Sequence, residues 1–384
     1  MAQTAWVSVM PDSALLKRNR NILAFILLLA VVLRIAITFF TGKAHMHIDT
    51  FDYYKQADAL LSGSFINYFP NGYPLLIALL KSISGEWVPT MLLWMNIMMG
   101  AGTVFFVYRI AGVFSSNSLV PLLAAFLTAV FPSQINYSRW LLSEVPSVFF
   151  LTGFYCCLFE KKNTAAGLLM AAAVLVRTEF IPVFLGTLVL ELFFKRKIRW
   201  EMAAAFIMPV LAAAYYCYLK TGVFAIAGHS KVNIMYSVTA AGGYIDWDFM
   251  TKHPEVQTAE QARTLYMQFA IDNPVQFIKN KLANLWELWG FFPSSSGGNR
   301  GLGARLLIGA SNFFLLTAGF AGWWRNRTLL AATLLMLPFI VVTGVHTLLL
   351  AFPRYTFAAE PFLLIFAADV LVAVLTKKTK SGIS

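Results

Sequence analysis

Long apolar runs recur from one end of this chain to the other, and they decide what it can fold into. They cover residues 21–41, 87–108, 118–136, 141–159, 164–194, 202–219, 305–323, 328–345 and 356–376. A helix of about 20 apolar residues crosses the hydrocarbon core of a bilayer. Only 12% of the 384 residues are charged, whereas soluble domains have about 25%. The sequence therefore predicts an all-α polytopic membrane protein and excludes a soluble enzyme.

Basic residues gather in short clusters between the apolar runs. Fifteen of the 30 lysines and arginines are Lys17, Arg18, Arg20, Arg109, Lys161, Lys162, Lys195, Arg196, Lys197, Arg199, Arg325, Arg327, Lys377, Lys378 and Lys380. Cytoplasmic loops of membrane proteins carry an excess of such residues, and all fifteen share one side if the run 164–194 crosses twice. We therefore expect a multi-pass protein of a bacterial inner (plasma) membrane with both termini cytoplasmic. The net charge of +12 thus marks topology and does not indicate nucleic-acid binding.

The run 164–194 decides how many spans there are. Its 31 residues are too many for one span and too few for two full ones, because each helical residue adds about 1.5 Å. Both flanks are basic, so we expect a hairpin of two short helices with Arg177-Thr178-Glu179 at its apex, below the membrane surface. Arg177 and Glu179 either pair with each other at the helix break or line a cavity. With this hairpin counted as two, the prediction is about ten transmembrane helices.

Most residues suited to chemistry fall in two segments that this topology places outside the cytoplasm. Within a single membrane domain over residues 1–384, these are residues 42–86 after the first helix and residues 220–304 after the seventh. The cytoplasmic loops are short, and the sequence has neither a P-loop nor a dinucleotide-binding motif. The three cysteines lie in apolar runs without the spacing of a zinc site. We therefore expect an active site on the extracytoplasmic side.

The first of these segments holds an amphipathic stretch, residues 50–62, which suits a helix lying in the membrane interface. Asp49 precedes it and is either the helix N-cap or a carboxylate able to take a proton from an acceptor hydroxyl. Asp52 adds a favourable negative charge in the first turn. His45 and His47 form an H-x-H pattern, which alone is weak evidence for a metal site.

The second segment is expected to hold helices of its own. Thr258-Ala-Glu-Gln261 is a capping box that opens a helix to Asp272, and Asn273-Pro274 opens another. The second helix has an apolar face formed by Phe277, Ile278, Leu282, Leu285, Trp286 and Trp289. That face suits docking on the membrane surface. Residues 293–303 lack periodicity and predict either a lid over a site or a plain connector.

Further polar residues fall at the extracytoplasmic ends of the apolar runs. His346, Arg354 and Tyr355 flank the entry to the last run, while Arg139 and Glu144 lie in and after a short turn. Arg354 either anchors the membrane interface or binds a phosphate, whose oxygens match the guanidinium fork. These residues and the carboxylates of the first segment are expected to form one extracytoplasmic mouth.

Seven short motifs follow one another along the chain. They are Asp49 with Tyr53, the helix end at Gly63, Pro70-Asn71-Gly72-Tyr73-Pro74, Leu142-Ser143-Glu144-Val145-Pro146, Arg177-Thr178-Glu179, Asn273-Pro274 and Pro353-Arg354-Tyr355. In this order and on this topology the chain resembles GT-C glycosyltransferases, and among them the protein O-mannosyltransferase and lipid A aminoarabinose transferase group, over residues 20–375. The resemblance implies transfer of a sugar from a polyprenyl phosphate to an acceptor outside the cytoplasm. It also implies that Asp49 is the general base.

The chain departs from this group at one position that bears on catalysis. Many relatives carry an Asp-Glu pair where this chain has Asp49-Thr50, so a second catalytic carboxylate would have to come from Asp52. Dependence on a divalent metal is therefore left open, and no cofactor is expected besides the lipid-linked sugar phosphate that serves as donor. A separate C-terminal soluble domain is not expected either, which places acceptor recognition in the loop 220–304.

The prediction is thus an integral membrane glycosyltransferase that moves a sugar from an undecaprenyl, decaprenyl or dolichyl phosphate to a lipid, glycan or protein acceptor, with inversion. Arg354 would hold the donor phosphate, with His346 and Arg139 as helpers. The other expected substrate-binding residues are Tyr53, Glu144, Arg177, Glu179 and Tyr355. One rival prediction is a transporter or lipid-linked-sugar flippase, which needs a path to both faces and matched halves. The other is a noncatalytic membrane assembly factor, which leaves the converging charges unexplained.

Overall fold

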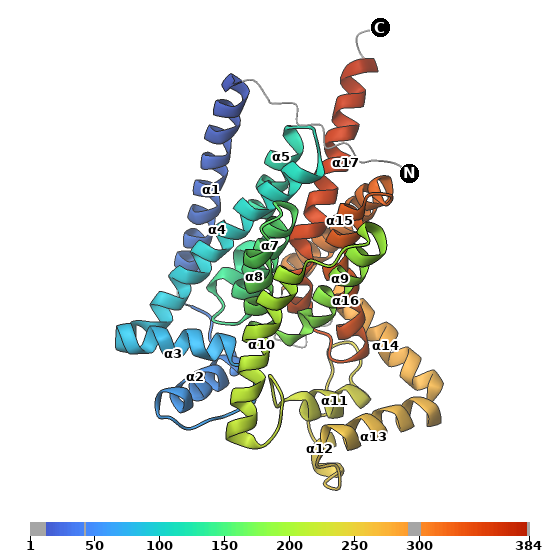
Figure 1. Ribbon diagram of the computed structural model, residues 1–384. Coiled ribbons are helices and arrows are strands. Elements are labelled where there is room, and N and C mark those ends of the chain that lie inside the picture. Colours follow the sequence, from blue (N-terminus) through green and yellow to red (C-terminus); the bar gives the residue numbers. More distant parts are fainter. Residues whose placement is uncertain (1–12, 42–43, 291–300, 382–384) are drawn as a thin grey trace.

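The computed structural model describes residues 13–41, 44–290 and 301–381, and its regular structure is helical. Within these ranges the only β-pairings are two isolated bridges, His45 with Trp140 and Ala241 with Tyr244. Long helices form a bundle, and short helices gather at its lower end in Figure 1. The all-α class predicted from the sequence is therefore confirmed.

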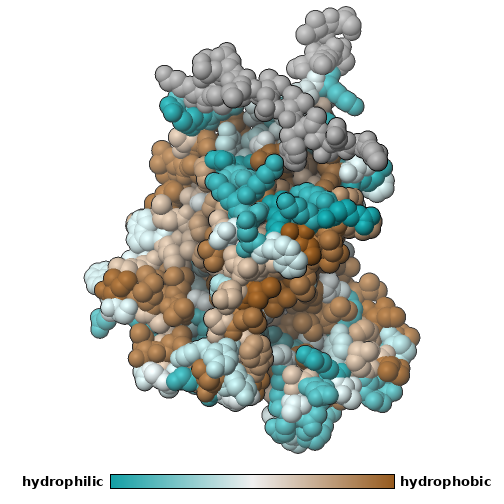
Figure 2. Space-filling model, in the orientation of Figure 1, coloured by the Kyte–Doolittle hydropathy of each residue, from teal (hydrophilic) through white to brown (hydrophobic). Residues whose placement is uncertain are grey.

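The apolar segments all form helices. In chain order these are α1 (Ser13–Thr41), α4 (Val88–Phe114), α5 (Leu119–Val130), α7 (Glu144–Phe159), α8 (Asn163–Val176), α9 (Ile181–Lys195), α10 (Trp200–Thr221), α15 (Leu302–Asn326), α16 (Leu330–Leu348) and α17 (Glu360–Ser381). Hydrophobic residues cover the middle of the face seen in Figure 2, and hydrophilic ones lie toward its two ends. The chain is an integral membrane protein.

The number of full membrane spans is a separate question from the number of apolar helices. By length and composition, five helical stretches of the described residues are able to cross a membrane, or six when one bent pair is counted as a span. α7 and α8 are apolar but have only 16 and 14 residues. The predicted number of about ten membrane spans therefore stays a prediction.

The bent pair lies in the run 118–136. After α5 and Phe131, the chain continues in α6 (Pro132–Asn136) and the 3₁₀ turn η2 (Tyr137–Arg139), at 56° to α5. Pro132 has no N–H to continue the hydrogen bonds of α5, which accounts for the break. The bend leaves carbonyl groups at the end of α5 without helical donors.

Arg34 of α1 supplies a hydrogen-bond donor at this break. From its sequence alone, the apolar run that contains Arg34 looks like a simple membrane anchor. Its side chain is fully buried and donates to the carbonyl oxygens of Ala30 at 3.0 Å and Ala129 at 3.5 Å. Gly100 of α4 makes room for it, since a Cβ at that position would lie 2.5 Å from the Arg34 Nε. A charge inside the bundle is thus placed against backbone carbonyls, as is usual for arginines in membrane helices.

The run 164–194 has the shape expected of a short hairpin. α8 and α9 have 14 and 15 residues, and Arg177 with η3 (Thr178–Phe180) separates them. Arg177 has an extended backbone (φ −146°, ψ 108°), and Pro182 follows in the first turn of α9. The backbone break lies where the sequence predicts it. The break places Arg177 and Glu179 at the lower end of the hairpin.

The segment after α1 forms α2 (Ile48–Leu61), α3 (Gly72–Ser84) and the 3₁₀ turn η1 (Gly85–Trp87). α2 begins earlier than predicted because His47, and not Asp49, is its N-cap: the His47 Nδ1 accepts the Asp49 N–H at 3.2 Å. The Thr50 Oγ1 completes this capping box by accepting the His47 N–H at 3.0 Å. The interpretation of Asp49 as a cap is therefore wrong, and its carboxylate is free to make other contacts.

The segment after α10 holds α11 (Ser230–Thr239), α12 (Phe249–Lys252), α13 (Ala259–Asp272) and α14 (Pro274–Trp289). The predicted capping box is confirmed, since the Thr258 Oγ1 accepts the Gln261 N–H at 3.2 Å and the Gln261 Oε1 accepts the Thr258 N–H at 3.0 Å. Residues 291–300, most of the predicted loop or lid over 293–303, lie outside the described residues.

α14 turns its apolar face outward and its polar face inward. The exposed apolar side chains are Val275, Ile278, Leu282, Leu285 and Trp286. On the buried side, the Lys281 Nζ donates to the Ser237 carbonyl at 2.9 Å. Trp289 does not belong to the exposed face, contrary to the predicted pattern, because it is buried and its Nε1–H donates to the Thr343 Oγ1 at 3.0 Å.

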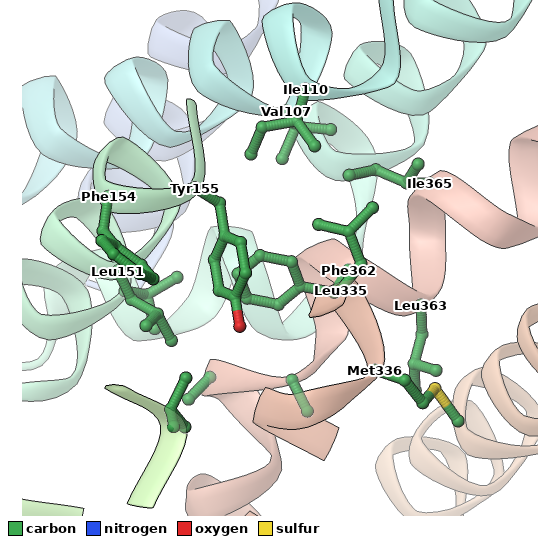
Figure 3. Packing of buried hydrophobic residues seen from close by; sticks show 14 of the residues in the cluster. Val107, Ile110, Leu151, Phe154, Tyr155, Leu335, Met336, Phe362, Leu363 and Ile365 are labelled. Carbon is green, nitrogen blue, oxygen red and sulfur yellow. The ribbon is translucent and has the colours of Figure 1, made fainter. Parts of the chain in front are cut away.

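Aromatic packing between α7, α16 and α17 forms the core above these segments. Figure 3 shows Tyr155 and Phe362 among the packed side chains, and their ring centroids are 5.0 Å apart. The Tyr155 hydroxyl donates to the Leu334 carbonyl of α16 at 2.9 Å. In a bilayer, close packing and hydrogen bonds of this kind hold helices together. The 3₁₀ helix η4 (Pro353–Ala358), between α16 and α17, leads from this core to the lower end.

Candidate active site

A pocket of about 120 Å³ lies where α2, the hairpin apex, α11 and η4 meet. It is lined by Asp49, Tyr53, Phe69, Pro70, Ser143, Glu144, Val176, Arg177, Thr178, Glu179, His229, Asn233, His346, Arg354 and Tyr355. These residues come from both long segments between apolar helices and from the lower ends of α7, α8 and α16. The fold therefore gathers at one place residues spread over most of the chain.

Asp49 and Arg354 form an ion pair in this pocket. The Arg354 Nη2 lies 2.8 Å from the Asp49 Oδ2, and its Nη1 lies 3.5 Å from the His47 Nδ1. The His47 cap holds Asp49 in the first turn of α2, while Pro353 opens the 3₁₀ helix that carries Arg354. The contact joins residues 305 positions apart in the sequence.

Arg177 and Arg354 join three carboxylates into one network. The Arg177 Nη1 lies 3.1 Å from the Glu144 Oε1, and its Nε and Nη2 donate to the two Glu179 oxygens at 3.0 and 3.1 Å. The Arg354 Nε lies 3.7 Å from the same Glu144 oxygen. The Glu144 Oε2 has no hydrogen-bond partner within the described part of the chain. Arg177 and Glu179 thus do both things foreseen for them, since they pair with each other and line a cavity.

His346 and Tyr355 close the network on the side of α16. The His346 Nε2 lies 3.1 Å from the Glu179 Oε2, and its Nδ1 lies 3.1 Å from the Leu350 carbonyl oxygen. Both ring nitrogens thus face an acceptor, which fixes the plane of the imidazole. The His346 ring stacks on Tyr355 with centroids 3.9 Å apart, and the Arg177 guanidinium lies 5.2 Å from the centre of the Tyr355 ring. The charged groups are therefore held in fixed orientations.

The pairing sets the protonation of Asp49 and Arg354. Burial alone would raise the pKa of the Asp49 carboxyl, but the contact with His47 and the positive charge of Arg354 outweigh it and hold that pKa at about 2. Burial lowers the pKa of Arg354, yet Tyr355, Glu144 and Asp49 together hold it well above its usual value. Both groups are therefore ionised at neutral pH.

Eight of the ten residues predicted for the site line the pocket, namely Asp49, Tyr53, Glu144, Arg177, Glu179, His346, Arg354 and Tyr355. Asp52 does not, because it lies on an exposed part of α2, where Tyr53 reaches the pocket in its place. Arg139 does not either. Its Nε donates to the Asn136 Oδ1 at 3.1 Å, and its backbone carbonyl accepts the His45 N–H at 2.8 Å.

Sequence reasoning missed His229 and Asn233, which reach the pocket from the start of α11. The His229 Nδ1 lies 2.7 Å from the Tyr68 carbonyl oxygen. A carbonyl only accepts, so Nδ1 carries the proton and Nε2 is the lone-pair nitrogen of the neutral ring. Burial lowers the pKa of His229, which favours this neutral form. The one local signal is Gly228, where a Cβ would clash with the Asn67 carbonyl oxygen.

The donor set of the pocket does not fit a metal ion. Within the described ranges, no group of three or more His, Cys, Asp or Glu side chains is arranged to hold one. Asp49, Glu144 and Glu179 are each bound to a guanidinium, which already balances the charge that a metal would need. His45 of the H-x-H pattern packs on Trp140, with ring centroids 3.9 Å apart. The three carboxylates of the pocket are thus engaged by arginines.

Comparisons with known proteins identify the architecture. No protein-family model and no curated protein matches the sequence. Three solved structures of an oligosaccharyltransferase from Archaeoglobus fulgidus are similar. AglB in complex with an inhibitory peptide and a dolichol-phosphate has a TM-score of 0.57 and 15% identity, over 95% of this chain and 51% of AglB.

The enzyme tethered with an acceptor peptide containing the NVT sequon has a TM-score of 0.54 and 14% identity, over 94% of this chain and 50% of that one. Its complex with Zn and sulfate has a TM-score of 0.52 and 15% identity, over 93% and 49%. The chain thus spans about half the length of the structures it matches. AglB is a glycosyltransferase of the GT-C superfamily. By this likeness the present chain has the GT-C fold.

Proposed function

We propose that this protein is a membrane glycosyltransferase that transfers a sugar from a polyprenyl-phosphate donor to an acceptor hydroxyl outside the cytoplasm. The observation that carries the proposal is the Asp49 carboxylate 2.8 Å from the Arg354 guanidinium in a pocket of the GT-C fold. The similar AglB structure holds a peptide and a dolichol-phosphate, which supports a lipid-linked donor. Membership of the O-mannosyltransferase and aminoarabinose transferase group, and a lipid, glycan or protein as acceptor, belong to the proposal.

The proposed reaction is a single displacement at the anomeric carbon. The acceptor oxygen attacks this carbon from the face opposite the phosphate, and the bond between the carbon and the phosphate oxygen breaks. The phosphate leaves with the bonding electron pair, the acceptor proton passes to the Asp49 carboxylate, and the configuration inverts. Arg354, with Arg177 and His346 behind it, stabilises the charge that develops on the phosphate.

The depth of the pocket suits a donor anchored in the bilayer. The pocket lies at the apex of the hairpin, and the 14 residues of α8 reach only about 21 Å into a hydrocarbon core of about 30 Å. A phosphate bound at the apex would therefore sit below the headgroup level, with its isoprenoid chain still in lipid. Its sugar would face α2 and α11, the segments from which the acceptor arrives.

The topology belongs to the same proposal. The start of α1 and the end of α17 lie at the end of the bundle away from α2, α3 and α11 (Figure 1). The basic clusters favour that end as the cytoplasmic one. The pocket would then open outside the cytoplasm, in a bacterial plasma membrane.

The decisive experiment is substitution of Asp49. Purified Asp49→Asn protein, mixed with a polyprenyl-phosphate sugar and an acceptor extract, should release free polyprenyl phosphate at least about 100-fold more slowly than wild type, since general bases contribute this much or more. Asp52→Asn is the matched control, because it changes an exposed aspartate of the same helix outside the pocket. Full activity in Asp49→Asn would refute the assignment. Movement of the intact donor across the bilayer without its cleavage would favour a flippase instead.

A further inference from the structure

The carboxylate proposed as the base begins bound to the group proposed to hold the leaving phosphate. The Arg354 guanidinium contacts the Asp49 Oδ2 at 2.8 Å, the Glu144 Oε1 at 3.7 Å and the His47 Nδ1 at 3.5 Å. A carboxylate held in such a pair is a weak base, because its charge is already neutralised. For the proposed reaction to proceed, this contact must be exchanged for another.

The charges of the pocket leave no arginine free for an anion. Three carboxylates, Asp49, Glu144 and Glu179, share two guanidiniums, so each arginine is already paired with at least one carboxylate. An entering phosphate must therefore displace a carboxylate from its arginine. The guanidinium fork suits this exchange, because it binds phosphate oxygens with the same two-bond geometry as a carboxylate.

Burial decides which carboxylate gives way. The Asp49 side chain is 22% exposed, compared with 13% for Glu179 and 7% for Glu144. Glu179 is held by Arg177 through two hydrogen bonds and by His346 at 3.1 Å, whereas Asp49 has one hydrogen bond from Arg354 and the His47 ring at 3.4 Å. The contact between Arg354 and Asp49 is therefore the one most readily opened by an incoming anion.

We propose that the donor phosphate, as it binds, replaces Asp49 as the partner of Arg354. Binding of the leaving group then also releases the Asp49 carboxylate, which removes the acceptor proton. This inference rests on the proposed function and adds an order of events to it: donor first, acceptor second. Once the phosphate is seated, its negative charge near the freed carboxylate makes Asp49 a stronger base. An acceptor that arrived before the donor would meet a base still held by arginine.

The exchange predicts an unusual phenotype, in which the variant that loses transfer gains affinity for the leaving group. Asp49→Asn removes the competitor for Arg354 and one negative charge, so it should bind farnesyl phosphate about tenfold more tightly than wild type. Arg354→Gln should weaken this binding, and adding Asp49→Asn to Arg354→Gln should restore only the smaller part of the gain that comes from the lost negative charge, because the competition acts through Arg354. Asp52→Asn should bind as wild type does.

The measurement is calorimetric titration of farnesyl phosphate into the purified protein in detergent, with farnesol titrated in parallel to account for partitioning of the lipid tail. Inorganic phosphate tests whether the tail is needed: equal gains with it would keep the exchange but overturn the lipid-linked ligand. The thermal unfolding of every variant is recorded, and Arg354→Lys replaces Arg354→Gln if the latter does not fold.

Two results separate this inference from the proposed function. If Asp49→Asn loses transfer but binds farnesyl phosphate no more tightly than wild type, the exchange is wrong while the catalytic role of Asp49 stands. The exchange is equally wrong if the full tenfold gain in affinity persists in the Arg354→Gln background. Full transfer by Asp49→Asn would refute the base assignment and, with it, the inference.

Discussion

The two ends of helices α7, α8 and α9 carry ion pairs of the same residue types in very different surroundings. At the pocket end, the Arg177 and Arg354 side chains are only 13% and 14% exposed. At the opposite end, Glu160 pairs with Arg109 at 2.6 Å and with Lys162 at 2.7 Å, and these two cations are 47% and 62% exposed. Arg177 and Arg354 are thus enclosed by protein, while Arg109 and Lys162 remain in contact with solvent.

Residue types alone therefore do not identify a site in this molecule. A cation in water loses little when its partner is removed, so the pairs around Glu160 contribute little energy. An enclosed arginine and its carboxylate partners stabilise one another, because each would otherwise be a buried charge without compensation. In the pocket, a change of partner therefore alters the chemistry of the remaining groups, whereas around Glu160 it does not.

The same substitution at both ends should therefore have unequal effects. Arg177→Met removes the main cationic partner of the enclosed Glu144 and Glu179, which keep only Arg354 at 3.7 Å and His346 at 3.1 Å, and it should cost about 3 kcal/mol of unfolding free energy. Arg109→Met leaves Glu160 with Lys162 and with water, and it should cost about 1 kcal/mol or less. Thermal unfolding of the purified variants in detergent measures both, and equal losses would show that enclosure is not what separates the two ends.

A histidine inside the pocket should matter more than one outside it. His229→Ala removes a pocket-lining ring that is oriented by the Tyr68 carbonyl, and it should slow sugar transfer about tenfold, a barrier change of about 1.4 kcal/mol. His253→Ala is the matched control in the same segment, because its ring pairs with Glu255 in an exposed region. Release of polyprenyl phosphate measures both rates. Comparable rates for the two variants would show that His229 has no role in sugar transfer.

The dependence of stability on pH tests the Asp49 pair. The folded-state pKa of Asp49 is about 2, below the ordinary value of about 3.9. The pair therefore stabilises the fold fully above about pH 4 and loses this contribution as the pH falls toward 2. The difference in Tm between wild type and Asp49→Asn should shrink over that range.

The Asp52→Asn variant should follow the wild-type curve throughout, because Asp52 lies outside the pocket. A constant difference between wild type and Asp49→Asn down to pH 2 would mean that the substitution acts through something other than the charge of Asp49.

The features predicted well from the sequence depend on neighbouring residues alone. The capping box at Thr258, the helix start at Asn273-Pro274 and the break at Arg177 each follow from a few consecutive residues and from known helix-end chemistry. The apolar runs likewise form helices at the expected places, although α7 and α8 are too short to settle how the bundle crosses the bilayer. The prediction that Asp49 is the N-cap of α2 was wrong because His47 takes that position.

The features missed depend on partners far away in the chain. No local sequence pattern predicts the contact between Asp49 and Arg354. Nor does one predict that Arg34 packs against the end of α5, in space that Gly100 leaves open. His229 sits in a segment without periodicity, so only the fold brings it to the pocket. Topology and basic clusters predicted the region of the site, and long-range packing decided which polar residues share it.

The outward apolar face of α14 has a practical consequence for anyone who wishes to study the segment 222–301 alone. Cut from the bundle, this piece would turn Ile278, Leu282 and Trp286 toward water and expose a contiguous apolar surface, which favours self-association. A soluble fragment for raising antibodies or screening acceptors would first need these positions changed to polar residues. The buried partners of Lys281 would need to be kept, since they hold the helix to its neighbours.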